Sequence, residues 1–156
     1  MNVSFRPVKE EDEDFLLSVY ASTREEEMTR VSWSDAQKEA FLRMQFDAQA
    51  LHYRERYPDA SLEVILADGN PAGRLYKAVL DDEIRIIDIT LLPRHRGYGI
   101  GTPIIRDIMA EAARIDRAVR IHVETFNRSL SLFRRLGFVP IEDNEIYTLM
   151  EWRKER

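Results

Sequence analysis

The chain has 156 residues, of which 44% are apolar and 33% charged, and its formal net charge at pH 7 is −5. This length and balance predict one globular domain, residues 1–156, with a full apolar core. The acidic charge disfavours a nucleic-acid partner. The lack of cysteine excludes disulfides, cysteine metal sites and a cysteine acyl-enzyme. No signal-peptide core and no apolar run of membrane-spanning length is found, which predicts a cytoplasmic protein without a membrane partner.

In the first half of the chain, periodicity predicts a strand at Val3 to Pro7 and a helix from about Glu11 to Thr23. Ser34 and Asp35 are suitable caps for a second, long helix that runs to about Arg56. Three strands then follow, joined by turns at Asp68 to Pro71 and Asp81-Asp82, which predicts an antiparallel meander. These strands are Leu62 to Ala67, Ala72 to Leu80 and Ile84 to Leu92.

Closely spaced glycines join the third of these strands to an apolar helical pattern that runs from Ile100 to Ile115. The frame is Arg96-x-x-Gly99-x-Gly101, and Gly97 occupies its first variable position. Glycine lets backbone N–H groups approach a ligand closely, and the helix start adds a positive dipole end. The loop is therefore expected to bind an anion, and phosphate is the obvious candidate.

Two common phosphate loops do not fit this spacing. A nucleotide-triphosphatase loop needs a Lys-Ser/Thr pair after its last glycine, and here Gly101 is followed by Thr102 and Pro103. A dinucleotide fingerprint would need its third glycine at the position of Thr102. A magnesium-dependent nucleotide enzyme is thus disfavoured.

The rest of the chain predicts a strand, a helix and two closing strands. The expected order of elements is therefore β-αα-βββ-α-β-α-ββ, an α/β (α+β) fold with about four helices. The segments are a strand at Val119 to Glu124, a helix between Asn127 and Gly137, and strands at Phe138 to Ile141 and Ile146 to Trp152.

The glycine frame resembles the acyl-CoA pyrophosphate loop of the GNAT superfamily of N-acetyltransferases. The segment from Asn127 to Phe138, NRSLSLFRRLGF, resembles the family's later motif, N-x-x-A-x-x-L-Y-x-x-x-G-F, with two departures. The spacing from asparagine to glycine is one residue shorter, and Phe133 occupies the usual tyrosine position. The resemblance implies a GNAT-like mixed, mostly antiparallel central sheet in which two strands splay apart to admit acetyl-CoA, with transfer of the acetyl group to an amine.

The resemblance also implies which residues bind acetyl-CoA as the acyl donor. Main-chain groups of Ile89 and Leu91 would pair with the pantetheine arm, and Asn127 would contact the arm from the other side. Phe133 would lie where the family's tyrosine protonates the departing thiolate. The pyrophosphate would be held by Arg96 and by the backbone of Gly97, Tyr98, Gly99, Ile100, Gly101 and Thr102.

Direct attack on the thioester needs a neutral amine, so a base or a water chain is expected nearby. His122 is the first candidate, because its ordinary pKa near 6.5 suits the task and it aligns with a catalytic glutamate of some relatives. Asp88 is the second candidate, and Glu124 shares a face with His122 and would orient it or attract a cationic substrate. No metal is expected.

Phe133 leaves a second function open, because phenylalanine cannot protonate a thiolate. The alternative is a catalytically silent acyl-CoA-binding sensor or interaction module. If the chain is an enzyme, water or a hydroxyl such as Tyr98 or Ser131 would supply that proton. The acceptor, a small molecule or a peptide, is not identified by the sequence. An exposed last strand would also allow a homodimer.

Overall fold

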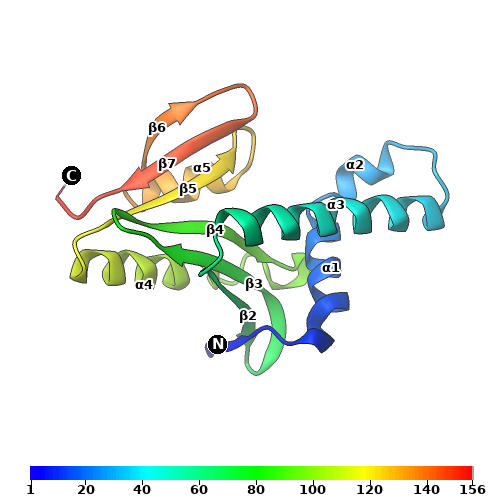
Figure 1. The fold of residues 1–156 in the computed structure, drawn as a ribbon, viewed down its shortest axis with the longest axis horizontal. Helices are drawn as coiled ribbons and strands as arrows, with labels where there is room; N and C mark the ends of the chain where they lie inside the picture. The colour runs from blue at the N-terminus through cyan, green and yellow to red at the C-terminus, as the bar shows by residue number, and fades with distance from the viewer. Residues whose placement is uncertain (156) are drawn as a thin grey trace. The chain divides into compact units, whose positions relative to one another are not determined.

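The computed structural model describes residues 1–155, which form seven strands, five α-helices and two short 3-10 helices (Figure 1). The predicted order of elements is confirmed, apart from the extra short helix α2. The elements are β1 (Val3–Pro7), η1 (Glu10–Asp12), α1 (Glu13–Ser22), α2 (Glu25–Thr29), α3 (Asp35–Arg56), β2 (Ser61–Ala67), β3 (Asn70–Val79), β4 (Glu83–Leu91), η2 (Pro93–His95), α4 (Gly101–Arg114), β5 (Ala118–Glu124), α5 (Ser129–Arg135), β6 (Val139–Asp143) and β7 (Tyr147–Trp152).

All seven strands belong to one sheet, in the order β1-β2-β3-β4-β5-β7-β6. β4 and β5 are parallel, whereas β1 with β2, β5 with β7, and β6 with β7 are antiparallel. The predicted mixed sheet is therefore confirmed. The expectation that the last strand would form an edge is wrong, because the chain turns back after β6 and places β7 between β5 and β6.

By their internal contacts the residues form two compact units. Unit 1 comprises residues 1–75 and 90–96, and unit 2 comprises residues 76–89 and 97–156. β3 and β4 contribute residues to both units. Within the described residues, no helix is long and apolar enough to cross a membrane.

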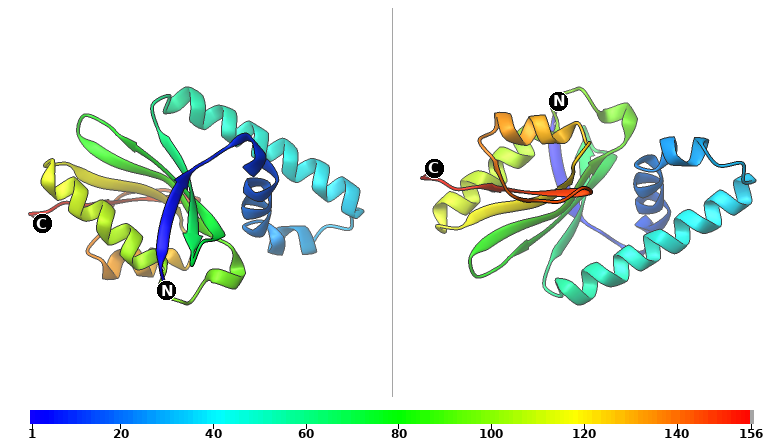
Figure 2. Two further views of the ribbon diagram at one scale, coloured as in Figure 1. Left: turned by 90° about the horizontal axis from the view of Figure 1, so that it is seen from below. Right: turned by 90° about the horizontal axis from the view of Figure 1, so that it is seen from above.

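In unit 1, α1 packs against α3 (Figure 2). The apolar stripe of α1 supplies Leu16 and Tyr20, and α3 supplies Phe46, whose ring centroid lies 5.9 Å from that of Tyr20. The start of α3 is capped by Ser34, one of the two caps that the sequence predicted, and the cap is a reciprocal capping box with Gln37. The Ser34 hydroxyl accepts from the Gln37 amide at 3.2 Å, and the Gln37 side chain accepts from the Ser34 amide at 2.9 Å.

In unit 2, α4 packs against β5 (Figure 1). One face of α4 is apolar because isoleucines recur at helical spacing, and Ile104, Ile105 and Ile108 are buried. Side chains alternate along β5, so Val119, Ile121 and Val123 are buried on one face of the strand. The same alternation leaves Arg120, His122 and Glu124 on the other face.

Candidate functional site

β4 and β5 pair as parallel strands over only the first half of β4. Their register runs from Glu83 opposite Ala118 to Ile86 opposite Ile121 and ends there. β5 nevertheless continues to pair with β7 as far as Glu124 opposite Tyr147. We call the point after Ile86 and Ile121 the fork. This is the kind of opening that the splayed-strand expectation requires, and His122 is the first residue of β5 beyond it.

The glycine loop leads directly into α4 and has backbone donors without protein partners. Gly97 and Gly99 have φ angles of 80° and 74°, a region in which only glycine is unstrained. Within the described residues, the amides of Tyr98, Gly99 and Ile100 donate to no backbone carbonyl. No side chain caps the start of α4 either. The loop and the first turn of α4 therefore have backbone N–H groups without a partner among the described residues, at the positive end of the helix dipole.

The loop also has space for a ligand. A Cβ atom built on Gly97, Gly99 or Gly101 would meet no other atom within 4 Å. The glycines are therefore not required by packing against the protein. Unpartnered N–H groups beside open space are the features that a phosphate site requires, and the phosphate site itself stays a prediction.

Arg96 and Leu91, both in unit 1, contact each other directly. The Arg96 Nε donates to the Leu91 carbonyl at 3.0 Å. Arg96 was expected to add positive charge at the head of the loop, and Leu91 was expected to offer main-chain groups to pantetheine. The structure ties the arginine to that main chain, so its Nη groups are the part of the guanidinium left for an anion.

Asn127 and Phe133 lie at the start and in the middle of the segment that includes α5. The Asn127 Oδ1 accepts from both the amide and the hydroxyl of Ser129, each at 2.8 Å, which leaves the Asn127 Nδ2 as a donor. The Phe133 ring is buried, and its centroid lies 5.1 Å from that of Phe138. The position of the expected tyrosine is thus filled by an apolar ring that packs in the core.

His122 is an exposed side chain with two close neighbours. Its Nδ1 lies 3.2 Å from the Arg85 Nη1 on β4, and its ring centroid lies 6.4 Å from that of Tyr147 on β7, in an edge-to-face arrangement. Protein atoms displace water around the ring and lower the pKa of His122, and the Arg85 charge lowers it further. Glu142 and Glu83 oppose this shift of the pKa but do not cancel it. The ring is therefore neutral at pH 7.

The two candidate carboxylates are placed differently from each other. Glu124 is exposed and lies two residues beyond His122, so the two side chains share a face of β5. Asp88 is half-buried on β4, and alternation puts it on the face of Ile86, opposite the face of Arg85 and His122. Neither residue is without an interaction partner. Among the described residues no group of three or more acidic or histidine side chains could hold a metal ion.

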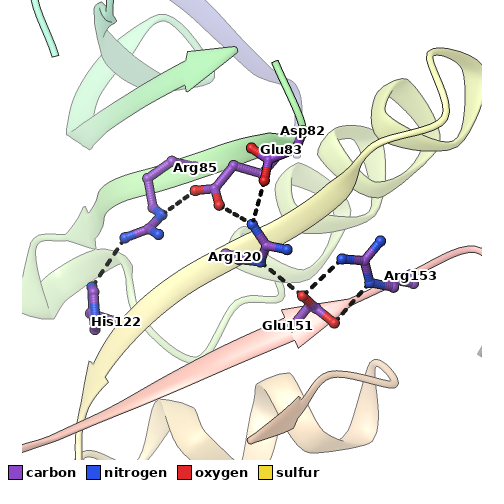
Figure 3. Close-up of polar contacts among 7 residues, drawn as sticks. All are labelled: Asp82, Glu83, Arg85, Arg120, His122, Glu151 and Arg153. Carbon is purple, nitrogen blue, oxygen red and sulfur yellow. Dashed lines mark hydrogen bonds and ion pairs between the residues drawn. The ribbon is translucent and has the colours of Figure 1, made fainter. Parts of the chain in front are cut away.

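Sequence reasoning missed a row of charged side chains beside His122 (Figure 3). We call this the charged row, and it spans β4, β5 and β7 and the residues next to them. Its members are Asp82, Glu83, Arg85, Arg120, Glu151 and Arg153. Glutamates are rarely buried unless they are paired, and Glu83 and Glu151 are 5% and 4% exposed. Alternating charges in two predicted strands were the available signal, but the strand register was needed to interpret them.

Arg120 is the centre of the charged row. Its guanidinium donates to Glu83 and, at 2.8 Å, to Glu151. Burial lowers the pKa of Arg120, but the hydrogen bonds with Glu83 and Glu151 outweigh it and raise the pKa above its ordinary value. The side chain is therefore a permanent cation that joins three strands of unit 2.

Comparisons with known proteins agree with this geometry. A family model described as "Acetyltransferase (GNAT) domain" matches residues 21–148. No curated protein matches the chain. Among solved structures, the PaiA N-acetyltransferase from Thermoplasma acidophilum, in complex with coenzyme A, superposes with a TM-score of 0.72 at 16% identity, over 98% of this chain and 99% of that one.

Two further structures are similar over nearly the whole chain. An acetyltransferase from Thermus thermophilus gives a TM-score of 0.70 at 17% identity and covers 98% of this chain and 97% of its own. Naa50 from Arabidopsis thaliana, in complex with the bisubstrate analogue CoA-Ac-MVNAL, gives 0.62 at 13% identity, with 97% and 99% covered. At these identities the similarity shows a shared fold.

Proposed function

Because the chain belongs to the GNAT acetyltransferase family, we propose that it transfers the acetyl group of acetyl-CoA to a primary amine of a small molecule or peptide. The observation that carries the proposal is the glycine loop, which has unpartnered backbone donors and open space beside its glycines at the uncapped start of α4. CoA bound to PaiA N-acetyltransferase and a CoA-peptide analogue bound to Naa50 support the choice of donor and of acceptor class.

In the proposed site, the backbone of Gly97 to Thr102 holds the pyrophosphate, with the dipole of α4 behind it. The Arg96 guanidinium adds positive charge. The pantetheine arm pairs with the main chain at Ile89 and Leu91, and the Asn127 amide donates to the arm. Phe133 is packed in the core and supplies no proton.

Transfer proceeds by direct attack. The lone pair of the neutral amine forms a bond to the thioester carbonyl carbon, the carbonyl electrons move to oxygen, and their return breaks the C–S bond. A backbone N–H near Leu91 stabilises the oxyanion. The amine proton passes to a base, and the thiolate takes a proton from water or from a hydroxyl such as Tyr98. His122, Asp88, Glu124 and a water chain are the candidate bases.

The first experiment is calorimetric titration of acetyl-CoA into the wild type and into the Gly101→Glu variant. This substitution places a carboxylate in the proposed anion site, and it does not strain the backbone because residue 101 is helical. Ala110→Glu is the matched control, because it adds the same charge at an exposed position nine residues farther along α4. We expect Gly101→Glu to weaken binding by about 100-fold or more, as a like charge replaces an attractive contact. Ala110→Glu should bind as the wild type does.

Thiol release over a panel of amines then separates the two functions. Release of CoA only when an amine is present establishes the transferase. Binding without release would favour the acyl-CoA sensor, an outcome that the buried Phe133 ring keeps open. Unchanged binding in Gly101→Glu would contradict the assignment of the loop to pyrophosphate.

A further inference from the structure

The contact between Arg85 and His122 determines which nitrogen of the imidazole carries the proton. The two atoms, Arg85 Nη1 and His122 Nδ1, are 3.2 Å apart. A guanidinium can donate hydrogen bonds but cannot accept them. The Nδ1 atom must therefore be the acceptor, so in the neutral ring the proton is on Nε2.

Arg85 is held in this position by buried partners (Figure 3). Its Nε donates to the Glu83 Oε1 at 2.6 Å, and the other Glu83 oxygen accepts from Arg120. Arg120 in turn contacts Glu151, whose carboxylate also accepts from Arg153 at 3.0 Å. If Arg85 moved away from His122, a carboxylate that is 5% exposed would lose a partner, which is costly.

The three carboxylates of the charged row are matched by three guanidinium groups. Within the row, Glu83 favours a proton on His122, but the nearer Arg85 guanidinium opposes it more strongly. The other groups of unit 2 near the ring come from the neighbouring strands. Glu142 on β6 favours the protonated ring, and Tyr147 on β7 contacts it edge to face. Glu124, on the same strand, shares its face.

His122 is also placed where a substrate can reach it. The ring is exposed, and it is the first β5 residue beyond the fork, immediately after the last parallel pair, Ile86 and Ile121. Arg85 directly precedes Ile86 on β4, and its side chain lies on the same face of the sheet as that of His122. Since Arg85 takes the Nδ1 side of the ring, Nε2–H is the group that a substrate can meet.

We propose that Arg85 is a positioning residue, which occupies the only lone pair of neutral His122 and so makes it a hydrogen-bond donor through Nε2, not the base. This inference rests on the proposed acetyl transfer. The proton released by the amine then passes to Glu124, which is on the same face, or to water. His122 donates to an oxygen atom of the acceptor and orients it at the fork.

Nitrogen NMR tests the inference without any turnover. Long-range proton–nitrogen spectra of the 15N-labelled protein report which imidazole nitrogen is protonated. His122 is assigned by the signals that disappear in His122→Gln. We expect a single Nε2–H tautomer in the wild type and a mixture in Arg85→Met, with a raised His122 pKa because the nearby cation is gone. Arg85→Gln, whose amide can still donate, should restore part of the Nε2–H population.

The matched control is Arg153→Gln. Arg153 contacts the same charged row through Glu151, is half exposed, and has no contact with His122. Its substitution should leave the His122 signals unchanged, and the signals of His52 and His95 should not move in any of these variants. An Nδ1–H tautomer in the wild type, or the same tautomer mixture in wild type and Arg85→Met, would overturn the inference.

Kinetics separates a donor from a base. The glutamine Nε2 in His122→Gln can donate where the imidazole Nε2–H did, but an amide cannot take up a proton near neutral pH. We expect His122→Ala to lose about tenfold or more of kcat/KM, and His122→Gln to lose clearly less than His122→Ala while keeping the acidic limb of the wild-type pH profile. Equal losses of about 100-fold in both variants, with the acidic limb abolished, would identify His122 as the base.

The two proposals fail in different ways. If the wild type acetylates no amine, the proposed function fails, whereas the tautomer spectra still decide whether Arg85 sets the state of His122. If transfer occurs but the spectra show no effect of Arg85, the transferase stands and the positioning role is refuted.

Discussion

Gly73 on β3 and Gly101 at the start of α4 have opposite surroundings. A Cβ atom on Gly73 would lie 2.1 Å from the Thr90 carbonyl oxygen and 3.0 Å from the Leu91 Cα, whereas one on Gly101 would meet nothing within 4 Å. Gly73 is buried between strands, while Gly101 belongs to a loop and helix start that are open to solvent. The fold requires the first glycine and does not require the second.

The difference shows that a glycine in a recognisable sequence motif need not be required by the packing of the fold, and that a glycine required by the packing need not belong to a motif. Gly101 belongs to a motif that can be recognised by its pattern, and in the proposed function its small size leaves room for the pyrophosphate. Gly73 belongs to no motif, yet it lets β3 approach the backbone of Thr90 and Leu91 closely. In the proposed function, that backbone is where pantetheine pairs, so Gly73 would support the site from within the sheet.

Gly73→Ala should give the largest loss of stability. Because the added methyl meets backbone atoms that cannot rotate away, we expect a loss of about 4 kcal/mol or more in the free energy of unfolding, with poor recovery of folded protein. Urea unfolding followed by circular dichroism would measure it. A loss below about 1 kcal/mol would mean that β3 and β4 shift apart easily and that the fold does not require Gly73.

Gly99→Ala should have an intermediate effect of a different origin. The φ of 74° at Gly99 disfavours an alanine by about 1 kcal/mol even though the space around it is open. We expect the free energy of unfolding to fall by about 1 kcal/mol. We also expect weaker acetyl-CoA binding, because the loop relaxes to another conformation. Thermal unfolding and calorimetric titration of the same sample would show both effects. Unchanged binding would mean that the loop conformation is not needed for the ligand.

Ser34→Ala compares a helix start closed by the protein with the open start of α4. The Ser34 hydroxyl caps α3 by accepting from the Gln37 amide, so its removal should cost about 1 kcal/mol of unfolding free energy. Affinity for acetyl-CoA should be unchanged, because no group of the glycine loop is altered. Chemical unfolding and titration are again the measurements, and a change in affinity would show that the cap of α3 influences the donor site.

Gly101→Ala should have the smallest effect on stability and a clear effect on binding. Its backbone is already helical and its Cβ would meet no protein atom, so we expect the unfolding free energy to change by no more than about 0.5 kcal/mol. If the open space receives the pyrophosphate, the methyl should weaken acetyl-CoA binding by about tenfold. A variant that binds as the wild type does would remove Gly101 from the contact surface.

The sequence predicted local structure well, because its signals are local. β1 was predicted with its observed bounds, Val3–Pro7, and the capping pattern at Ser34 gave the start of α3. Helix α2, Glu25–Thr29, was missed because its run of glutamates has no apolar periodicity. The edge strand was misassigned because strand order depends on how the chain returns to the sheet, which short-range patterns do not encode.

By itself the sequence determined the order of elements, the glycine loop and the family resemblance, since spacing, periodicity and turn residues carry each of them. Only the tertiary structure decided that Gly73 meets Thr90, that Phe133 is buried against Phe138, and that Arg85 meets His122. The last contact joins residues 37 positions apart. It exists because β4 and β5 pair in one particular register, and shifting that register by one residue would turn the side chains to opposite faces of the sheet.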